Sequence, residues 1–319
     1  MTRSKKWSEK FDFLRLSANI FLDLRIKKLT SIVYRNGLWM PRADYINDMG
    51  LWRAKSILEV LEARKQTMFH WDYHDERLIR SCVDYGIPVT QPQFPGRDDI
   101  EMQAKKLLIS SSGESLVWML ASAGDSEDMK TPEGMPIFTL KVTNFAKRNP
   151  PSYRLTIENH VRELPTIKLT ASYGSGTYYK EQAEKKGFDS FLYWSDKYGI
   201  AEGPFDNFFA VMNDGALITP KHNILYGVTR RIVLDLARKS GIFKDVVERP
   251  IHIWQIHENY CREVFLTSTT LGIAEVKSIT SRKGGEPYTF KISPENTYTL
   301  ALKEKFLNYR KKYFSERGA

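Results

Sequence analysis

Residues 199–231 read GIAEGPFDNFFAVMNDGALITPKHNILYGVTRR, and their order of apolar runs and turn formers sets the expected fold of the second half of the chain. The apolar run 208–212 predicts a strand, and the NDG triplet at 213–215 suits the positive backbone dihedral angles of a tight hairpin turn. Gly227 then precedes a predicted helix over 229–240. Free backbone amides at such a helix start can converge on an anion, although most helices begin without a ligand.

One lysine upstream of this stretch, Lys168, is a candidate nucleophile. It lies among apolar neighbours in residues 164–188, LPTIKLTASYGSGTYYKEQAEKKGF, and Tyr173 follows five residues later. Apolar surroundings remove hydration from a charged amine, which makes its neutral, nucleophilic form easier to reach. For one lysine alone, a surface position with the charge in water is the commoner outcome. Glu202 is equally ambiguous, because a carboxylate beside a glycine is most often a solvated turn residue.

Taken in order, these residues resemble the class IV aminotransferases. The shared pattern is K-x4-Y at Lys168, E-G-x3-N-x-F at Glu202, a D-G hairpin ending in T-P, G-V-T-R before a helix, and E-V-F-L-T-S-T at residues 263–269. The family contains branched-chain aminotransferases, D-amino-acid aminotransferases, R-selective amine transaminases and aminodeoxychorismate lyases. The resemblance extends over residues 31–290. It implies an α/β (α+β) fold, the two-lobed fold type IV of pyridoxal 5'-phosphate (PLP) enzymes, with a small N-terminal α/β domain, a larger C-terminal α/β domain and the cofactor in the cleft between them.

The resemblance assigns a role to each matching position. Lys168 corresponds to the lysine that carries PLP as a Schiff base and shuttles a proton, and Glu202 to the carboxylate that keeps the pyridine nitrogen protonated. His74 is given no catalytic role and is interpreted as a helix residue that is satisfied locally. The other expected cofactor-binding residues are Tyr173 beside the phenolic oxygen and, around the phosphate, Arg77 (in HDERL, similar to the family's H-x-x-R-L), Val228, Thr229 and Thr269.

Two departures from the family pattern concern the substrate. Residues 53–59, RAKSILE, lack the G-D-G and the aromatic residue that are usual there, and Ala123 stands where many members have an arginine. The common partner of the substrate carboxylate is therefore missing. We expect Arg53 or Lys55 to replace it, since a buried carboxylate without a partner costs roughly several kcal/mol. The alternative is that both cations are solvated and that backbone amides near Thr270 bind the carboxylate.

The length of 319 residues allows two compact lobes. Residues 123–136, AGDSEDMKTPEGMP, are poor in apolar side chains and rich in turn formers, so we place the domain boundary among them. The expected division is an N-terminal extension over 1–30, a small α/β domain over 31–130 and a large PLP-binding domain over 131–319. Within these parts we expect a hairpin at 31–41, strands at 67–71, 136–142, 153–158, 190–195 and 208–212, and helices at 50–61, 74–85, 98–109 (N-cap Asp98), 177–186, 229–240 and 294–313 (N-cap Ser293).

Composition limits the classes of function. Two cysteines far apart, Cys82 and Cys261, argue against a disulfide framework or a zinc knuckle and are compatible with a reducing compartment, and no metal site is expected. Charges interrupt every apolar run of residues 1–30, so we expect a cytoplasmic protein without a signal peptide or a membrane span. The net charge of +10 is spread thinly. Its densest run, 303–317, is interpreted as the solvated face of an amphipathic helix, so a nucleic-acid partner is not expected.

The leading hypothesis is a PLP-dependent transaminase of amino-acid metabolism. It moves an amino group between an amino acid, branched-chain or D-amino-acid-like, and a 2-keto acid through Lys168, and the resemblance also implies a homodimer. The alternatives are a PLP lyase resembling aminodeoxychorismate lyase, an R-selective amine transaminase, and a non-catalytic protein that keeps the fold. The intact set of Lys168, Glu202 and Arg77 argues against the last of these.

Overall fold

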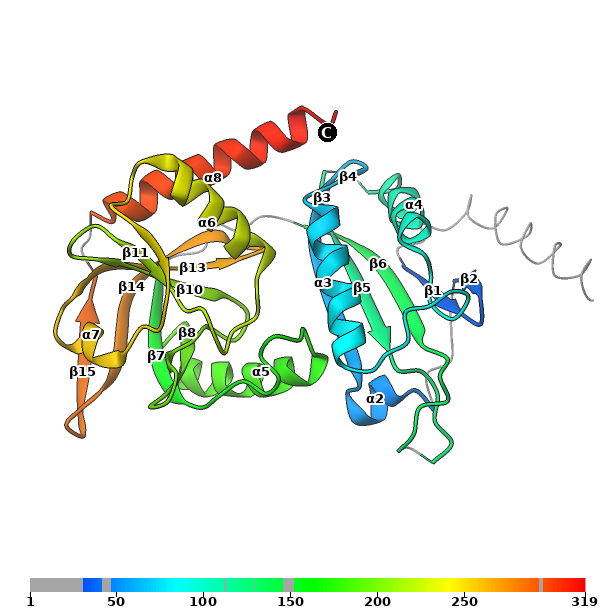
Figure 1. Ribbon diagram of the computed structural model, residues 1–319, viewed down its shortest axis with the longest axis horizontal. Coiled ribbons are helices and arrows are strands. Elements are labelled where there is room, and N and C mark those ends of the chain that lie inside the picture. The colour runs from blue at the N-terminus through cyan, green and yellow to red at the C-terminus, as the bar shows by residue number, and fades with distance from the viewer. Residues whose placement is uncertain are drawn as a thin grey trace, which may run out of the picture.

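The computed structural model describes residues 31–41, 47–111, 113–128, 130–145, 152–292 and 295–318. These residues form two lobes that lie side by side, each built on its own sheet (Figure 1). The first lobe comes from the N-terminal half of the chain and the second from the C-terminal half, as the α/β fold with a smaller and a larger lobe requires.

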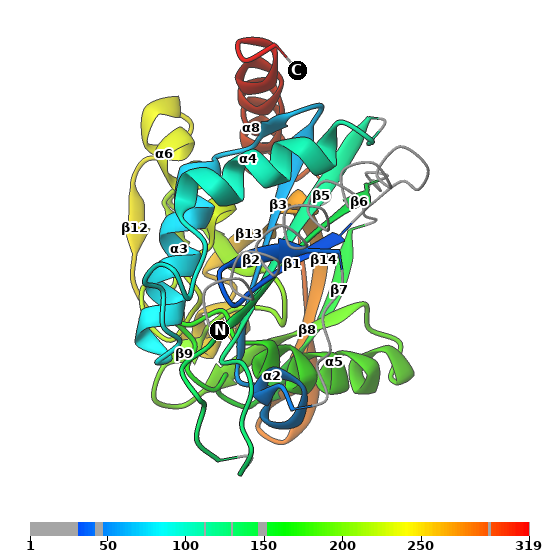
Figure 2. The same cartoon turned by 90° about the vertical axis from the view of Figure 1, so that its right-hand side faces the viewer.

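An antiparallel six-stranded sheet, in the order β2-β1-β6-β5-β3-β4, forms the first lobe. The helix α4 lies across this sheet (Figure 2). The helix α3 buries Trp71, Leu78 and Cys82, whose helical spacing places them on one apolar stripe. The elements are β1 (Ser31–Arg35), β2 (Leu38–Met40), α2 (Met49–Arg53), β3 (Ser56–Arg64), β4 (Thr67–Met68), α3 (Trp71–Asp84), α4 (Arg97–Leu108), β5 (Glu114–Ser122) and β6 (Ile137–Asn144).

A mixed nine-stranded sheet forms the second lobe, in the order β12-β11-β10-β13-β14-β7-β8-β9, with β15 paired to β14. Its strand β10 is buried along its whole length, and the predicted hairpin turn follows it, with Gly215 at a φ of 88°. The elements are β7 (Tyr153–Asn159), α5 (Thr170–Lys185), β8 (Ser190–Ser195), β9 (Gly199–Ile200), β10 (Asn207–Met212), β11 (Leu217–Thr219), α6 (Val228–Ser240), β12 (Val246–Glu248), α7 (Ile253–His257), β13 (Cys261–Ser268), β14 (Gly272–Lys283), β15 (Glu286–Lys291) and α8 (Thr297–Ser315).

The C-terminal helix α8 connects the two lobes. It packs on α6 and β14 of the second lobe, and its C-terminal half reaches toward the first lobe (Figure 1). Arg310 donates from Nε to Glu62 of β3 at 2.6 Å, and the Tyr309 hydroxyl lies 2.8 Å from Nε2 of His70. Arg310 was expected on a solvated face, but only 5% of it is exposed. The charge run 303–317 therefore contributes a buried contact between the lobes.

Residues 50–61 do not form the helix that their apolar spacing predicts. The helix α2 ends at Arg53, because Ala54 takes a left-handed φ of 50°, and the strand β3 begins at Ser56. All nine residues of β3 pair with β5, so a distant partner overrides the local pattern. Smaller corrections concern element bounds. The strand expected at 67–71 covers only Thr67–Met68, and the N-cap of α4 is Gly96 rather than Asp98. The helix expected from 177 begins at Thr170 and the helix expected from 294 begins at Thr297, while Ser293 and Pro294 lie outside the described residues.

The predicted domain boundary at residue 130 divides a sheet and is therefore misplaced. The segment 123–136 connects β5 to β6, which pair with each other in antiparallel register from Ser115 with Asn144 to Ser122 with Ile137. The chain passes to the second sheet after β6 and before β7. A segment rich in turn formers is equally suited to a long hairpin loop and to a linker.

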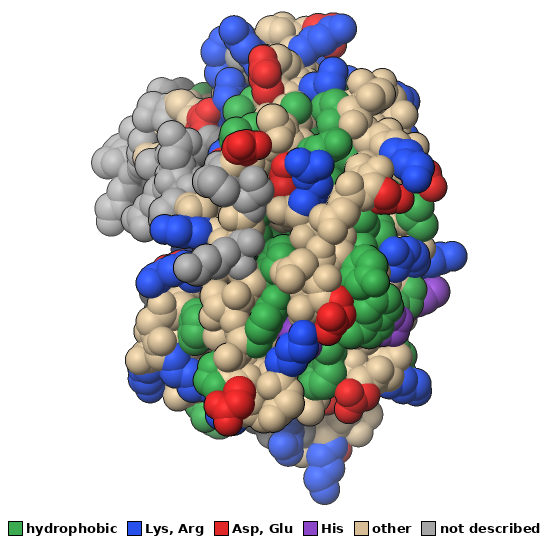
Figure 3. Space-filling view, turned by 90° about the vertical axis from the view of Figure 1, so that its left-hand side faces the viewer, with side chains coloured by type: hydrophobic (Ala, Val, Ile, Leu, Met, Phe, Trp, Pro, Cys, Tyr) green, Lys and Arg blue, Asp and Glu red, His purple; other side chains and the backbone are tan. Residues whose placement is uncertain are grey.

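Positive side chains do not form one large patch on the outer face of the second lobe. Figure 3 shows Lys and Arg side chains scattered there among acidic and apolar ones. Among the described residues, no helix has the length and apolar character needed to cross a membrane.

Candidate active site

All seven residues predicted to bind the cofactor line one cavity between the two lobes. They come from distant parts of the chain and from different elements. Arg77 lies on α3, Lys168 precedes α5, Tyr173 is on the first turn of α5, Glu202 lies between β9 and β10, Val228 and Thr229 begin α6, and Thr269 follows β13.

Lys168 and Tyr173 form the contact at one end of this cavity. The Lys168 Nζ donates a hydrogen bond to the Tyr173 hydroxyl, and only 9% of the lysine is exposed. Burial raises the pKa of the Tyr173 hydroxyl, but the positive charges of Lys168 and Arg162 outweigh it and lower that pKa. The backbone carbonyl of Lys168 accepts a hydrogen bond from the amide of Leu58 at 3.0 Å. The strand β3 of the first lobe therefore holds the lysine in place.

Glu202 is a buried carboxylate with three hydrogen-bond donors around it. Arg162 donates from Nη1 at 2.7 Å, Asn207 from Nδ2 at 2.8 Å, and the Leu225 amide at 3.1 Å to both oxygens. Burial raises the pKa of the Glu202 carboxyl, while the Arg162 guanidinium and the Leu225 amide oppose that rise. This arrangement fixes the carboxylate in one orientation, with a paired charge.

Arg162 and Asn207 line the cavity and contact Glu202, but neither was predicted as a site residue from the sequence. Arg162 is 3% exposed, and its guanidinium carbon lies 5.4 Å from the centroid of the Tyr173 ring, so it stands between the two ends of the cavity. Asn207 is the asparagine of the E-G-x3-N pattern, and it also donates to the Leu225 carbonyl at 2.7 Å. That pattern was the available signal for Asn207. Arg162, 40 residues before Glu202, had none.

The third part of the cavity is the N-terminus of α6. Its N-cap residue is Gly227, so no N-cap side chain accepts a hydrogen bond from the first amides of the helix. These amides also have no partner inside the helix. The amides of Val228 and Thr229 are therefore available to an anion. A Cβ at Gly227 would lie 2.1 Å from Oδ1 of Asn207, so glycine is required for this close approach.

Arg77 reaches this helix start from the first lobe. Its Nε and Nη2 donate to Glu59 at 2.8 and 2.7 Å, and its Nη1 donates to the Tyr226 carbonyl, next to Gly227, at 3.3 Å. His74 binds the same carboxylate, with Nδ1 2.9 Å from Oε1 of Glu59. Burial raises the pKa of Glu59, but Arg77 and His74 hold that pKa well below its usual range. His74 was interpreted as a helix N-terminal residue satisfied locally, but it lies one turn into α3 and its partner is Glu59 of β3, which also orients Arg77.

The predicted substrate-binding residues are less well placed. Arg53 is exposed at the end of α2, and Lys55 and Thr270 are half-buried. None of the three lines the cavity that contains Lys168. The backbone carbonyl of Lys55 accepts a hydrogen bond from the amide of Ala123 at 3.0 Å, so the altered segment 53–59 is adjacent to the position where many family members have an arginine.

The chemistry of the cavity fits PLP. Free amides at the start of α6 suit a phosphate, a fixed carboxylate suits a protonated ring nitrogen, and a buried amine suits the aldehyde carbon. Within the described part of the chain, Oγ1 of Thr267 and Nη2 of Arg162 are buried without a hydrogen-bond partner. Both residues line this cavity, where a polar ligand can supply the missing partners.

The sequence matches the family described as "Amino-transferase class IV" over residues 56–279. The chain belongs to this family. A "Putative branched-chain-amino-acid aminotransferase" of Methanocaldococcus jannaschii is 29% identical over 299 residues, which are 88% of this chain and 97% of that protein. A "Probable branched-chain-amino-acid aminotransferase" of Aquifex aeolicus is 32% identical over 150 residues, 45% of this chain and 46% of that protein.

Solved structures show the same fold. A branched-chain aminotransferase from Thermoproteus uzoniensis, crystallised with norvaline, superposes with a TM-score of 0.74 at 18% identity and covers 90% of this chain and 98% of that one. An aminotransferase from Brucella abortus bound to PLP gives a TM-score of 0.73 at 19% identity, covering 88% and 99%. The class IV chain is thus a PLP-dependent aminotransferase with the two-lobed fold type IV architecture, and its substrates are an amino acid and a keto acid.

Proposed function

We propose that this class IV aminotransferase uses Lys168 as its cofactor-bonding and proton-transferring lysine, and that its amino donor is an aliphatic, branched-chain type of amino acid. The observation that carries the first part is the buried contact between Lys168 and Tyr173 in the cavity that also contains Glu202. The names of the relatives from Methanocaldococcus jannaschii and Aquifex aeolicus support the second part.

PLP, when bound, supplies an electron-withdrawing ring that stabilises the charge developing on the substrate's alpha carbon. Glu202 would hold the proton of the ring nitrogen, and Arg162 and Asn207 donate to that carboxylate and orient it. Lys168 moves the alpha proton as a general base and acid. The Tyr173 hydroxyl, which contacts the Lys168 amine, would bind the phenolic oxygen of the cofactor.

The phosphate end is held by groups from both lobes. The amides of Val228 and Thr229 and the hydroxyl of Thr269, which line the cavity from the second lobe, would hold the phosphate. Arg77 comes from the first lobe, and its Nη1, already directed at the start of α6, is the nitrogen available to the phosphate. Because Glu59 keeps the other two guanidinium nitrogens, the arginine binds the phosphate without having to reorder.

For the substrate carboxylate, the structure favours the alternative over Arg53 and Lys55. Neither cation lines the cavity, whereas Thr267 and Thr269 do, and Oγ1 of Thr267 has no partner among the described residues. We propose that hydroxyls and backbone amides at the end of β13 and just after it, residues 267–269, bind the carboxylate; Thr270, the next residue, does not itself line the cavity. We also propose a homodimer, the assembly that the resemblance implies, which sedimentation of the purified protein would measure.

An absorbance titration tests the proposed donor. Purified protein with PLP should show a band near roughly 410–430 nm, and branched-chain amino acids should bleach it at lower concentration than acidic amino acids or simple amines. In a sample reduced with borohydride instead of being titrated, peptide mapping should locate a pyridoxyl group on Lys168. A label on another lysine would overturn the assignment, and preferential bleaching by a simple amine would overturn the donor class.

A further inference from the structure

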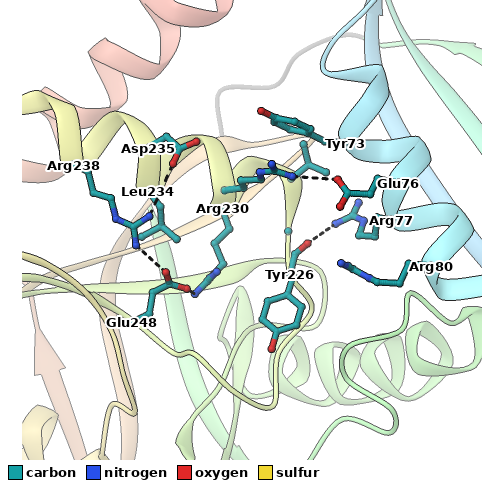
Figure 4. A pocket seen from close by; sticks show the side chains of 13 residues that line it. Tyr73, Glu76, Arg77, Arg80, Tyr226, Arg230, Leu234, Asp235, Arg238 and Glu248 are labelled. Carbon is teal, nitrogen blue, oxygen red and sulfur yellow. Dashed lines mark hydrogen bonds and ion pairs between the residues drawn. The ribbon is translucent and has the colours of Figure 1, made fainter. Parts of the chain in front are cut away.

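A second, larger cavity of about 310 Å³ lies between α3 and α6 (Figure 4). It borders the candidate active site, because Arg77, Gly227 and Val228 line both cavities. The proposed catalytic residues Lys168 and Glu202 are not among its lining residues. Its volume lies at the lower end of the range of small-molecule sites.

Arginine dominates the charge of this cavity. Five arginines line it, against the three acidic residues Glu76, Asp235 and Glu248. Glu248 is shared, since Arg230 and Arg238 each donate to one of its oxygens at 2.8 Å (Figure 4). Asp235 lies farther from Arg238, at 4.0 Å. The guanidinium groups of Arg230 and Arg238 therefore share one close carboxylate, that of Glu248.

Two arginines of the cavity, Arg80 of α3 and Arg231 of α6, are unpaired or weakly paired. Arg231 contacts the exposed Glu76 at 3.3 Å, and its guanidinium carbon lies over the Tyr73 ring, 3.8 Å from the centroid. The side chain of Arg80 has no hydrogen bond or ion pair with any residue that the structure describes. Figure 4 shows Arg80 extending from α3 toward Tyr226.

We propose that this cavity binds a phosphorylated small molecule, at a site separate from that of the cofactor. Guanidinium groups present fixed forks of N–H donors that match phosphate oxygens, and the choice of arginine over lysine at every basic position of the cavity fits such an anion. Arg80 and Arg231 bind the phosphate from opposite helices, and Tyr73 and Tyr226 supply ring surface for the rest of the ligand. The proposal concerns a ligand site beside the transamination chemistry and does not depend on which amino acid is the donor.

The test uses the PLP-loaded protein, so that the cofactor's own phosphate site is filled. Inorganic pyrophosphate is titrated by calorimetry, with sodium chloride at matched ionic strength as the control for screening. Saturable binding is expected, with an affinity reduced about tenfold or more by Arg80→Ala and further by Arg80→Glu. Arg80 is exposed, so neither variant should disturb folding.

Lys239→Ala is the matched control. Lys239 is exposed on α6 next to Arg238, carries the same charge and does not line the cavity. Its loss should change the affinity by less than about twofold, since a solvated charge outside the cavity is largely screened. The proposal is overturned if pyrophosphate binding does not saturate, or if Lys239→Ala weakens it as much as Arg80→Ala does.

Discussion

Replacing Arg162 by methionine would leave Glu202 as a buried carboxylate without its cation. The pair is almost fully buried, with 3% and 1% of the two side chains exposed, and its hydrogen bond measures 2.7 Å. Removing one partner of such a pair costs about 3–5 kcal/mol of folding free energy. Asn207 and the Leu225 amide still donate to Glu202, so we expect a loss near the lower end, about 3 kcal/mol.

A double-mutant cycle measured by urea unfolding separates this charge effect from lost packing. We expect Glu202→Gln alone to cost about 2–4 kcal/mol, because it leaves Arg162 as the uncompensated charge. The double variant should cost less than the sum by about 2 kcal/mol, since neither charge remains. The unfolding is measured without added PLP, so that altered cofactor affinity does not contribute. Arg154→Met, which removes the exposed pair with Asp189, is the matched control and should cost less than about 1 kcal/mol.

The same variant should have a defined pH dependence. Burial already raises the pKa of Glu202, and loss of Arg162 raises it further. A carboxyl whose pKa is higher in the folded state than in the unfolded state favours folding at low pH, and this contribution is lost as the pH rises through the raised pKa. The deficit of Arg162→Met should therefore be smaller at about pH 5 than at about pH 8. The coupling of Arg162 and Glu202 would be refuted if the free-energy losses of the two single variants added up to that of the double variant. It would also be refuted if the stability deficit of Arg162→Met grew toward acidic pH.

Three further predictions concern ligand binding. Lys168→Ala should abolish turnover and the borohydride-trapped label. Lys180→Ala, which removes a half-buried lysine of α5 paired with Glu184, should keep both; label retained in Lys168→Ala would contradict the assignment. Arg77→Ala should weaken PLP affinity by roughly tenfold to a hundredfold in an absorbance titration, since a charge-assisted contact contributes about 1.5–3 kcal/mol. Unchanged PLP affinity would show that Arg77 does not bind the phosphate. Arg53→Ala and Lys55→Ala should leave the KM for amino acids within about twofold of the unaltered enzyme's value, because neither residue lines the cavity. A large rise in KM for amino acids, but not for simple amines, would instead show that these residues bind the substrate carboxylate.

The part of the second lobe around the candidate site was predictable from sequence because its signals are local. The hairpin after β10 and the start of α6 depend on residues that are neighbours in the chain, such as Gly215 and Gly227, and both occur where expected. The order of the motif residues also placed the seven cofactor-binding candidates, and all of them line one cavity. Local order suffices where the chemistry is concentrated in short segments.

The parts that could not be predicted depend on distant partners. The strand β3 was mistaken for a helix because its pairing with β5 lies about 60 residues away and leaves no mark in the local spacing. The domain boundary failed for the same reason, since composition does not reveal that β5 and β6 are neighbours. Arg162 was missed because a single arginine, far in sequence from the carboxylate it neutralises, looks like any surface charge.

The altered segment 53–59 does not disrupt the cofactor site, because β3 contacts that site mainly through its backbone. The amide of Leu58 binds the carbonyl of Lys168, and the carbonyl of Val60 accepts the Thr269 hydroxyl at 3.5 Å. These contacts are independent of the side chains at 58 and 60. Between them, the Glu59 carboxylate, which the chain does retain, orients Arg77. Three consecutive residues of one strand thus contact Lys168, Arg77 and Thr269, so the segment can lose its usual glycines and aromatic residue while the proposed cofactor site stays intact.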